Sequence, residues 1–564
     1  MIRAARALHP LAALAPRKAL ARVCLRTPSA LSLRLPMGIF DSARMRNRAL
    51  VIQSERVESP VATSPLAETA VIPPRPTAIP QSHELAIDPG EAPSQIYSTS
   101  DVFARRATTM RVPYGFALTI GALTIGALTI GVAAVASAQT PSAPPKQAPD
   151  PRSLVLLGDR FKPLKYDEMT PEQKIMIDHL LAGERGGANG PFNVLLRSPE
   201  VGDLAQQFGG AMRFRTGLPK DVSEVIIIMT GRNWMAQYEW YSHKAAALRN
   251  GVNPAIVDAI ATGRRPAGMP PDMEVAYNLI DELLTSHQVT DATFKAAADK
   301  YGERRVVDMI GLSGWYGLVS MLLNVDRYPL PQGVQPELKP LENPLPAAGM
   351  GFATSIPGPV SPVEVKSSAK GKEFTMRGDR FKPLTYEQMT PQQQKMTDIA
   401  VSQRGTGGSF NISVRDPDGG QLFFDMGDRV RFHMSVPDKL KELTICLTAR
   451  YWGAQFEWLA HRRAAVQAGL SEDKVKAIAE GRRPVGMSAD EEAVYNFITE
   501  LFRTRQASDA VFAAVKSVAG ERGVVDLVVS AGYYQAVSMF MNADRLPLNA
   551  NQQPELKYLA HPLP

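Results

Sequence analysis

A glutamate and a histidine lie four residues apart at two places in the chain, Glu239 with His243 and Glu457 with His461. On a helix, side chains with this spacing share a face and can touch. A carboxylate beside an imidazole raises the pKa of the histidine or fixes its tautomer, which suits a proton donor or acceptor near neutral pH. The spacing therefore predicts general acid/base chemistry, with a purely structural Glu–His pair as the alternative.

A second carboxylate, Glu224 or Glu442, precedes each pair inside an otherwise apolar segment. A buried carboxylate needs a partner, and Arg232 and Arg450, a short distance further along the chain, are the candidates. One interpretation is a structural ion pair. The other is that the arginine binds a substrate carboxylate while the glutamate handles protons.

Aromatic residues flank the same segments. Trp234 and Trp452 are expected either to pack in the core or to form a platform for a substrate. The dipeptides Trp315-Tyr316 and Tyr533-Tyr534 in the last helix of each half could line the same cavity.

The sequence carries no signature of a metal site or a bound cofactor. Glu-x-x-x-His supplies two metal ligands, whereas zinc or iron normally needs a third from the protein. His179, His287 and His433 have no counterpart in the other half of the chain. Phosphate loops, nucleotide fingerprints and serine-hydrolase elbows do not occur. We expect neither a metal nor a cofactor, and a small molecule as the partner.

The motifs occur twice because the chain contains an internal repeat. The segment GDRFKPLKYDEMTPEQ at 158–173 returns as GDRFKPLTYEQMTPQQ at 378–393, and TGRNWMAQYEWYSHKAA at 230–246 returns as TARYWGAQFEWLAHRRA at 448–464. The repeat predicts two homologous domains in tandem, at 158–330 and 372–564, joined by a linker at 331–371 that is rich in Pro, Gly and Ala.

Each domain reads as a string of helices. Thr170 and Thr390 each precede a proline and, three residues on, a glutamine, which is the pattern of a capping box. Gly251 and Gly469 end the helix that carries the Glu–His pair. The first domain continues with predicted helices at 253–262, 271–286, 290–301 and 303–325. Strand-like alternation is nearly absent, so we predict an all-α protein.

The first 138 residues differ from the rest of the chain in charge. They carry fifteen basic and eight acidic residues and therefore the whole net charge of +7, whereas the remainder balances 48 basic against 48 acidic residues. Basicity thus gives no reason to expect a nucleic-acid partner. Residues 1–109 are predicted to be a disordered leader, either a transit-like segment or the product of a start placed upstream of Met110.

Residues 110–138 have the layout of a secretory signal. Arg111 precedes an uncharged apolar stretch, which ends in Ala136-Ser137-Ala138. Cleavage after Ala138 predicts an exported protein, periplasmic or secreted, that begins with a Pro-rich tether at 139–157. The stretch at 112–138 is also long enough to span a bilayer, which takes about 20 residues. An uncleaved membrane anchor is therefore the alternative.

Together these motifs resemble the carboxymuconolactone decarboxylase family, whose superfamily also holds the alkyl hydroperoxidase D-like (AhpD-like) proteins. The matching features are a Glu in the long apolar helix, an Arg shortly after it, Glu-Trp-x-x-His, an Ala-rich turn, and a helix that begins near EVAYNLIDEL or EAVYNFITEL. The resemblance covers both repeats. It implies two AhpD-like helical domains that pair within the chain as a pseudo-dimer, and further assembly into homo-oligomers.

The resemblance also implies a function, a cofactor-free carboxy-lyase that acts on a small carboxylated substrate of aromatic catabolism. The implied site residues are His243 and His461 as acid/base groups, Glu239 and Glu457 orienting them, Glu224 and Glu442 as a second proton group, and Arg232, Arg450, Trp234 and Trp452 as substrate-binding residues.

The peroxidase branch of the superfamily implies an alternative, an antioxidant oxidoreductase. That branch has a Cys-x-x-Cys pair where this chain has Ala236 and Glu239, or Ala454 and Glu457. Thiol peroxidase chemistry requires a thiolate and a resolving thiol, so the alternative is disfavoured, and Cys446 is expected to be a small core residue. A third possibility is a non-enzymatic module that binds a small acid.

Overall fold

The repeat and the helix signals in the sequence lead to a helical protein. The computed structural model describes residues 149–341, 357–559 and 561–563, all of which belong to one compact unit. The leader predicted at 1–109 and the signal or anchor segment predicted at 110–138 lie outside these residues.

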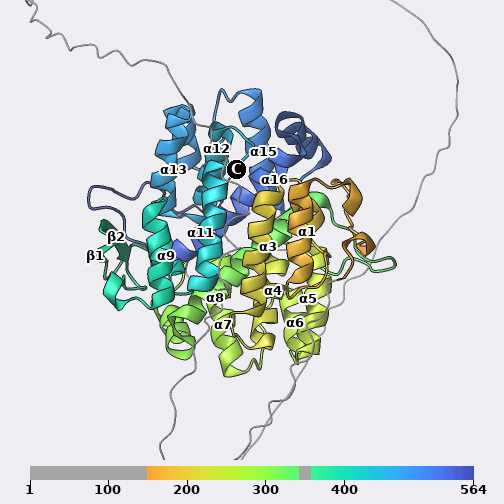
Figure 1. Ribbon diagram of the computed structural model, residues 1–564, viewed down its shortest axis with the longest axis horizontal. Helices are drawn as coiled ribbons and strands as arrows, with labels where there is room; N and C mark the ends of the chain where they lie inside the picture. The colour runs from red at the N-terminus through yellow and green to blue at the C-terminus, as the bar shows by residue number, and fades with distance from the viewer. Residues whose placement is uncertain (1–148, 342–356, 560, 564) are drawn as a thin grey trace, which may run out of the picture. The chain divides into compact units, whose positions relative to one another are not determined.

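The described residues contain sixteen α-helices and a single two-stranded sheet, which confirms the all-α prediction (Figure 1). The helices of the first repeat are α1 Pro171–Ala182, α2 Phe192–Leu195, α3 Pro199–Phe214, α4 Lys220–Asn233, α5 Gln237–Arg249, α6 Pro254–Ala261, α7 Pro271–Ser286 and α8 Asp291–Asp326. Those of the second repeat are α9 Pro391–Ser402, α10 Phe410–Ser413, α11 Pro417–Phe432, α12 Asp438–Trp452, α13 Gln455–Gln467, α14 Glu472–Ala479, α15 Ala489–Thr504 and α16 Asp509–Asp544. Short 3-10 turns lie at Pro151–Ser153, Tyr166–Glu168 and Tyr386–Gln388.

The helix starts and ends that the sequence predicts are present in the structure. The Thr170 hydroxyl accepts a hydrogen bond from the backbone of Gln173, and the Gln173 side chain accepts one from the backbone of Thr170. α5 ends before Gly251, whose φ of +90° favours glycine. The helices predicted at 290–301 and 303–325 are the two arms of α8, which bends at Gly302, where φ is +77°.

A β-hairpin begins inside the segment predicted as a linker. β1 (Val363–Ala369) pairs antiparallel with β2 (Lys372–Gly378). The two residues between the strands, Lys370 and Gly371, have positive φ values of 50° and 75°, as in the tight turns that match the twist of a hairpin. The second repeat therefore has an edge element that the all-α prediction did not include.

The chain of the first repeat runs on past residue 330 and packs against α5. The Gln237 amide donates to the Leu338 carbonyl at 2.8 Å, and Trp240 Nε1 donates to Glu337 at 3.0 Å. The second repeat makes the same contacts from Gln455 and Trp458 to the QPELK segment near its end. This segment is thus part of the repeat itself.

The two repeats pack together through α8 and α16, which cross closely where glycine replaces larger residues. A Cβ atom on Gly314 would lie 2.6 Å from the Ala536 Cβ, and one on Gly532 would lie 2.5 Å from a Leu318 methyl group. By length and composition α8 and α16 could each cross a membrane, and the most apolar window of each is 100% buried. They form the core of the described unit.

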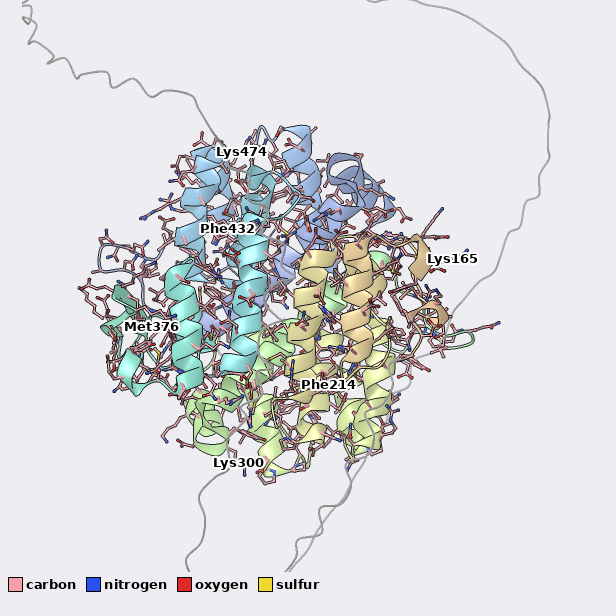
Figure 2. The ribbon with its side chains drawn as sticks, in the orientation of Figure 1. Lys165, Phe214, Lys300, Met376, Phe432 and Lys474 are labelled. Atoms are coloured by element: carbon pink, nitrogen blue, oxygen red, sulfur yellow. The ribbon has the colours of Figure 1, made fainter. Side chains whose placement is uncertain are left out.

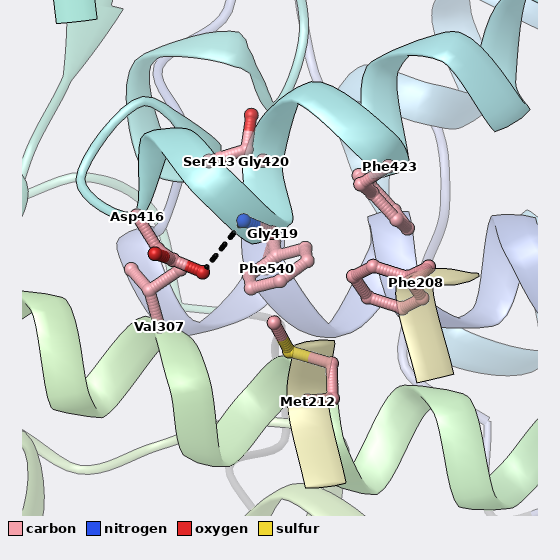
Figure 3. A pocket seen from close by; sticks show the side chains of 9 residues that line it. All are labelled: Phe208, Met212, Val307, Ser413, Asp416, Gly419, Gly420, Phe423 and Phe540. Atoms are coloured by element: carbon pink, nitrogen blue, oxygen red, sulfur yellow. Dashed lines mark hydrogen bonds between the residues drawn. The ribbon is translucent and has the colours of Figure 1, made fainter. Parts of the chain in front are cut away.

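α3 and α11 also lie side by side across the two repeats (Figure 1), with the rings of Phe208 and Phe423 5.2 Å apart. Figure 3 shows a cavity at this contact, which also reaches α8, α16 and the loop before α11. Its volume is about 10 Å³, at the lower limit for one water molecule. The cavity is too small for an organic substrate.

Candidate active site

The predicted Glu–His pair is part of a buried cluster formed by two helices. α4 supplies Glu224, and α5 supplies Glu239 and His243. The Nδ1 atom of His243 lies 2.6 Å from Glu224 Oε2, and its Nε2 atom lies 3.0 Å from Glu239 Oε1. The three residues are only 6%, 4% and 3% exposed, respectively. A single imidazole thus lies between two buried carboxylates.

The second repeat builds the same cluster. His461 Nδ1 lies 2.6 Å from Glu442 Oε2, and its Nε2 atom lies 2.7 Å from Glu457 Oε1. The six predicted acid/base residues are therefore brought together as two separate groups of three.

Each cluster also contains an arginine that sequence reasoning missed. Nη1 of Arg213, near the end of α3, lies 3.0 Å from His243 Nε2 and donates to the Tyr316 hydroxyl at 2.9 Å. Its Nη2 atom lies 3.8 Å from Glu224. The side chain of Arg213 is 27% exposed, so it lies between the buried histidine and the solvent.

Arg431 occupies the same place in the second repeat, 2.9 Å from His461 Nε2 and 3.6 Å from Glu442. The sequence signal for these arginines is an Arg-Phe dipeptide at matching positions, Arg213-Phe214 and Arg431-Phe432. Figure 2 labels the two phenylalanines, which lie at opposite ends of the neighbouring helices α3 and α11.

The geometry assigns different tasks to the two nitrogens of His243. Nδ1 faces a carboxylate at hydrogen-bonding distance and carries a proton that it donates to Glu224. Nε2 has two partners, because it can accept from Arg213 when it is unprotonated and face the Glu239 carboxylate when it is protonated. The proton that can leave is therefore the one on Nε2.

Electrostatics favours the charged imidazole. Burial by itself would lower the pKa of His243, but the charge of Glu239 and the hydrogen bond that the imidazole donates to Glu224 outweigh it, so the pKa is raised above its ordinary value. His461 shows the same balance with Glu457 and Glu442. Burial also raises the pKa of Tyr316 to about 12, which keeps its hydroxyl neutral near pH 7.

The structure places the other predicted arginines outside these clusters. Arg232 donates to the Lys339 carbonyl at 2.7 Å and contacts Met235 Sδ at 2.7 Å. The cation near Glu224 is Arg213, so the predicted pairing with Arg232 is wrong. Arg450 is buried, and its Nε and Nη1 atoms have no hydrogen-bond partner within the described part of the chain. Burial lowers its pKa to about 10.

The predicted aromatic platform residues lie between the repeats. The guanidinium carbon of Arg505 is 4.6 Å from the ring centre of Trp234, and the ring of His287 is 4.2 Å from that of Trp452. In each pair the two residues come from different repeats. Trp234 and Trp452 therefore contribute to the contact between the repeats, whereas Tyr316 is the aromatic residue that touches the first cluster.

Thiol and metal chemistry find little support in the part of the chain that the structure describes. Cys446 is 0% exposed, and burial raises the pKa of its thiol well above the ordinary value, which favours an inert thiol. No group of three or more His, Cys, Asp or Glu residues within 149–341, 357–559 and 561–563 is placed to hold a metal ion. In the cluster, both imidazole nitrogens already face carboxylates.

Comparison with known proteins found no match in the two searches that follow. None of the protein-family models searched matches the chain, and none of the curated proteins searched matches it. The class of the site is therefore defined by its own geometry, a buried histidine between two glutamates beside an arginine, formed twice in a helical repeat protein.

Proposed function

We propose that the chain is a carboxymuconolactone decarboxylase-like enzyme of the AhpD-like class, in which each repeat carries a cofactor-free acid/base site for a small carboxylated substrate. The observation that carries this proposal is the Glu–His–Glu cluster. An imidazole with a raised pKa is held by one carboxylate at Nδ1 and keeps its exchangeable proton at Nε2. Such a group is suited to general acid catalysis near neutral pH.

The proposed reaction needs one proton at carbon. When the bond between carbon and the substrate carboxylate breaks, its electron pair stays on carbon and carbon dioxide leaves. His243 Nε2 then gives its proton to that carbon, and water restores the proton afterwards. Glu224 holds the Nδ1 proton and the ring orientation throughout. Glu239 stabilises the imidazolium before the transfer.

Arg213 has a second task in this proposal. Its guanidinium is the partly exposed cation next to Nε2, and a cation there attracts a carboxylated substrate and favours negative charge that develops during the reaction. Arg213 thus takes over the role that the sequence suggested for Arg232. In the second repeat Arg431 takes over the role suggested for Arg450.

A screen of small lactone and muconate-type acids for carbon dioxide release by the full-length chain tests the proposal. We expect turnover that falls by at least about a hundredfold in the double variant His243→Gln/His461→Gln, because general acid catalysis contributes 10²–10⁴-fold. His179→Gln is the matched control, since His179 is an exposed histidine paired with Asp203.

Two results of this screen would contradict the proposal. Full turnover by the double variant would remove the histidines from the reaction. Saturable binding of an acid without any conversion would instead identify a non-enzymatic binding module.

We also propose export and self-association of the chain. Export rests on the signal-like sequence at 110–138, and self-association rests on the family resemblance. Fractionation of cells that express the full-length chain, followed by N-terminal sequencing of the product, tests cleavage after Ala138 against membrane anchoring. Light scattering coupled to size-exclusion chromatography tests the assembly.

A further inference from the structure

Three buried hydrogen-bond donors next to the first cluster have no acceptor among the residues that the structure describes. They are Nε and Nη2 of Arg185 and Nε1 of Trp315. The two side chains are neighbours, because the Arg185 guanidinium carbon lies 5.7 Å from the Trp315 ring centre. Buried donors almost always have a partner in a folded protein, so three of them together point to an absent acceptor.

These donors are connected to the acid/base site. Tyr316 follows Trp315 in α8, and its hydroxyl interacts with Arg185 as well as with Arg213. Burial holds the pKa of Arg185 below its usual range, although Tyr316 favours its charge. The charge of Glu239 also favours the charged form of Arg185, but Arg185 forms no salt bridge with any described residue. One hydroxyl group separates it from the arginine that touches His243.

The corresponding arginine of the second repeat, Arg404, is exposed to solvent, and one of its donors has an acceptor in the protein. Arg404 donates to the Phe424 carbonyl at 3.0 Å, and its guanidinium carbon lies 4.0 Å from the Phe424 ring centre. Tyr533 stands where the first repeat has Trp315, and its hydroxyl interacts with Arg404. Because Arg404 is exposed, its remaining donors can bind water, whereas the donors of Arg185 are buried.

Two glycines show that the aromatic residues occupy equivalent positions. A Cβ atom on Gly209 would lie 2.2 Å from the Trp315 ring, and one on Gly427 would lie 2.0 Å from the Tyr533 hydroxyl. Each ring thus crosses its neighbouring helix over a glycine. Among the described residues Trp315 Nε1 has no acceptor, whereas the Tyr533 hydroxyl interacts with Arg404.

We propose that Arg185 and Trp315 form a carboxylate-binding subsite that exists only in the first repeat, so that the two acid/base sites of the chain are not equivalent. The inference rests on the proposed function in one respect, since it takes the bound anion to be a carboxylate group of the substrate. The second repeat keeps the Glu–His–Glu cluster but binds acids weakly.

The donor set matches a carboxylate in shape. Nε and Nη2 lie on one edge of the guanidinium plane and present two parallel N–H groups, which suit the two oxygens of a carboxylate. The indole N–H adds a third donor. The Phe192 and Phe214 rings lie 5.3 and 5.7 Å from the guanidinium carbon, and Phe214 is 43% exposed, which places the subsite close to the surface.

Isothermal titration of the full-length chain with adipate, a six-carbon dicarboxylate, tests the subsite. We expect one adipate per chain and no binding of the neutral analogue adipamide. Arg185→Met should weaken binding at least about tenfold, the usual effect of losing a hydrogen-bonded charge pair. Arg404→Met is the matched control in the second repeat and should leave the affinity unchanged.

A milder variant keeps the test informative if Arg185→Met does not fold. Trp315→Tyr introduces the residue found at the equivalent position of the second repeat, where the Tyr533 hydroxyl interacts with Arg404. This variant should also weaken adipate binding. Two equal sites per chain, unchanged affinity in Trp315→Tyr, or no adipate binding up to about 10 mM would overturn the subsite. Because binding is measured apart from turnover, a subsite without any decarboxylation would separate this inference from a failure of the proposed function.

Discussion

The Nδ1 atom of His243 lies 2.6 Å from Oε2 of Glu224, and the same distance separates His461 from Glu442 in the second repeat. The contact joins the helix that follows Pro219 to the helix that carries the Glu–His pair. It fixes which nitrogen of the imidazole keeps its proton, and so it leaves Nε2 as the nitrogen that can exchange one.

Replacing Glu224 should loosen the first cluster. In Glu224→Gln the imidazole loses a charged hydrogen-bond partner, so we expect a lower pKa of His243 and a loss of about 1–3 kcal/mol in the free energy of unfolding. Urea denaturation measures the second effect. The exposed residue Glu172 supplies the control, because Glu172→Gln should change the stability by less than about 0.5 kcal/mol.

The two cluster histidines should make stability depend on pH in the neutral to alkaline range. Their pKa values are raised in the folded chain, whereas an unfolded histidine titrates near 6.5. The stabilisation is therefore complete below about pH 6.5 and is lost as the pH rises through the folded pKa. Urea denaturation between pH 6 and 9 should show a smaller decline in the free energy of unfolding for His243→Gln/His461→Gln than for the parent chain. An equal decline in both proteins would contradict the raised pKa of the two histidines.

His287 should act in the opposite direction at the contact between the repeats. Burial and the charge of Arg505 lower its pKa to about 3, and its ring packs 4.2 Å from Trp452. As the pH falls below about 6.5, His287 becomes protonated in the unfolded chain but stays neutral in the folded chain. The free energy of unfolding therefore falls by up to about 1.4 kcal/mol per pH unit. His287→Gln should remove this acid sensitivity in denaturation curves at pH 7 and pH 4. The exposed His433 provides the control variant His433→Gln.

Two helical glycines, Gly314 at the crossing of α8 with α16 and Gly210 in α3, should respond in opposite ways to replacement by alanine. Gly314→Ala places a methyl group 2.6 Å from Ala536 and should destabilise the chain by about 1–3 kcal/mol. In Gly210→Ala the nearest atom is 3.9 Å away, so the helix propensity of alanine should stabilise the chain by about 0.5–1 kcal/mol. Thermal unfolding of both variants measures the difference, and a neutral Gly314→Ala would mean that the crossing is looser than described.

Local signals in the sequence were sufficient for the helices and for the acid/base residues. Thr170 with its proline and glutamine starts α1 as predicted, and the four-residue spacing of Glu239 and His243 places them on one face of α5. Such signals act within one or two helical turns, where backbone geometry alone decides which side chains meet.

Contacts between helices were harder to foresee. Arg232 follows Glu224 in the same helix, whereas the arginine that approaches Glu224 comes from the end of α3. Trp234 is buried, but the sequence does not say that it faces Arg505 of the other repeat. In both cases the packing of distant segments decides the partner. The equivalence of Trp315 and Tyr533 similarly becomes informative only when their neighbours Arg185 and Arg404 are in place.

The most direct test of the central claim is the ¹⁵N NMR titration of the imidazole nitrogens of His243 and His461 in the full-length chain, assigned with the single His→Gln variants. We predict that Nδ1 of both residues stays protonated throughout and that Nε2 loses its proton with a pKa above the ordinary value of about 6.5. Loss of the Nδ1 proton, or an imidazole that is already neutral at pH 6, would contradict a histidine held between two carboxylates as the proton donor of the site.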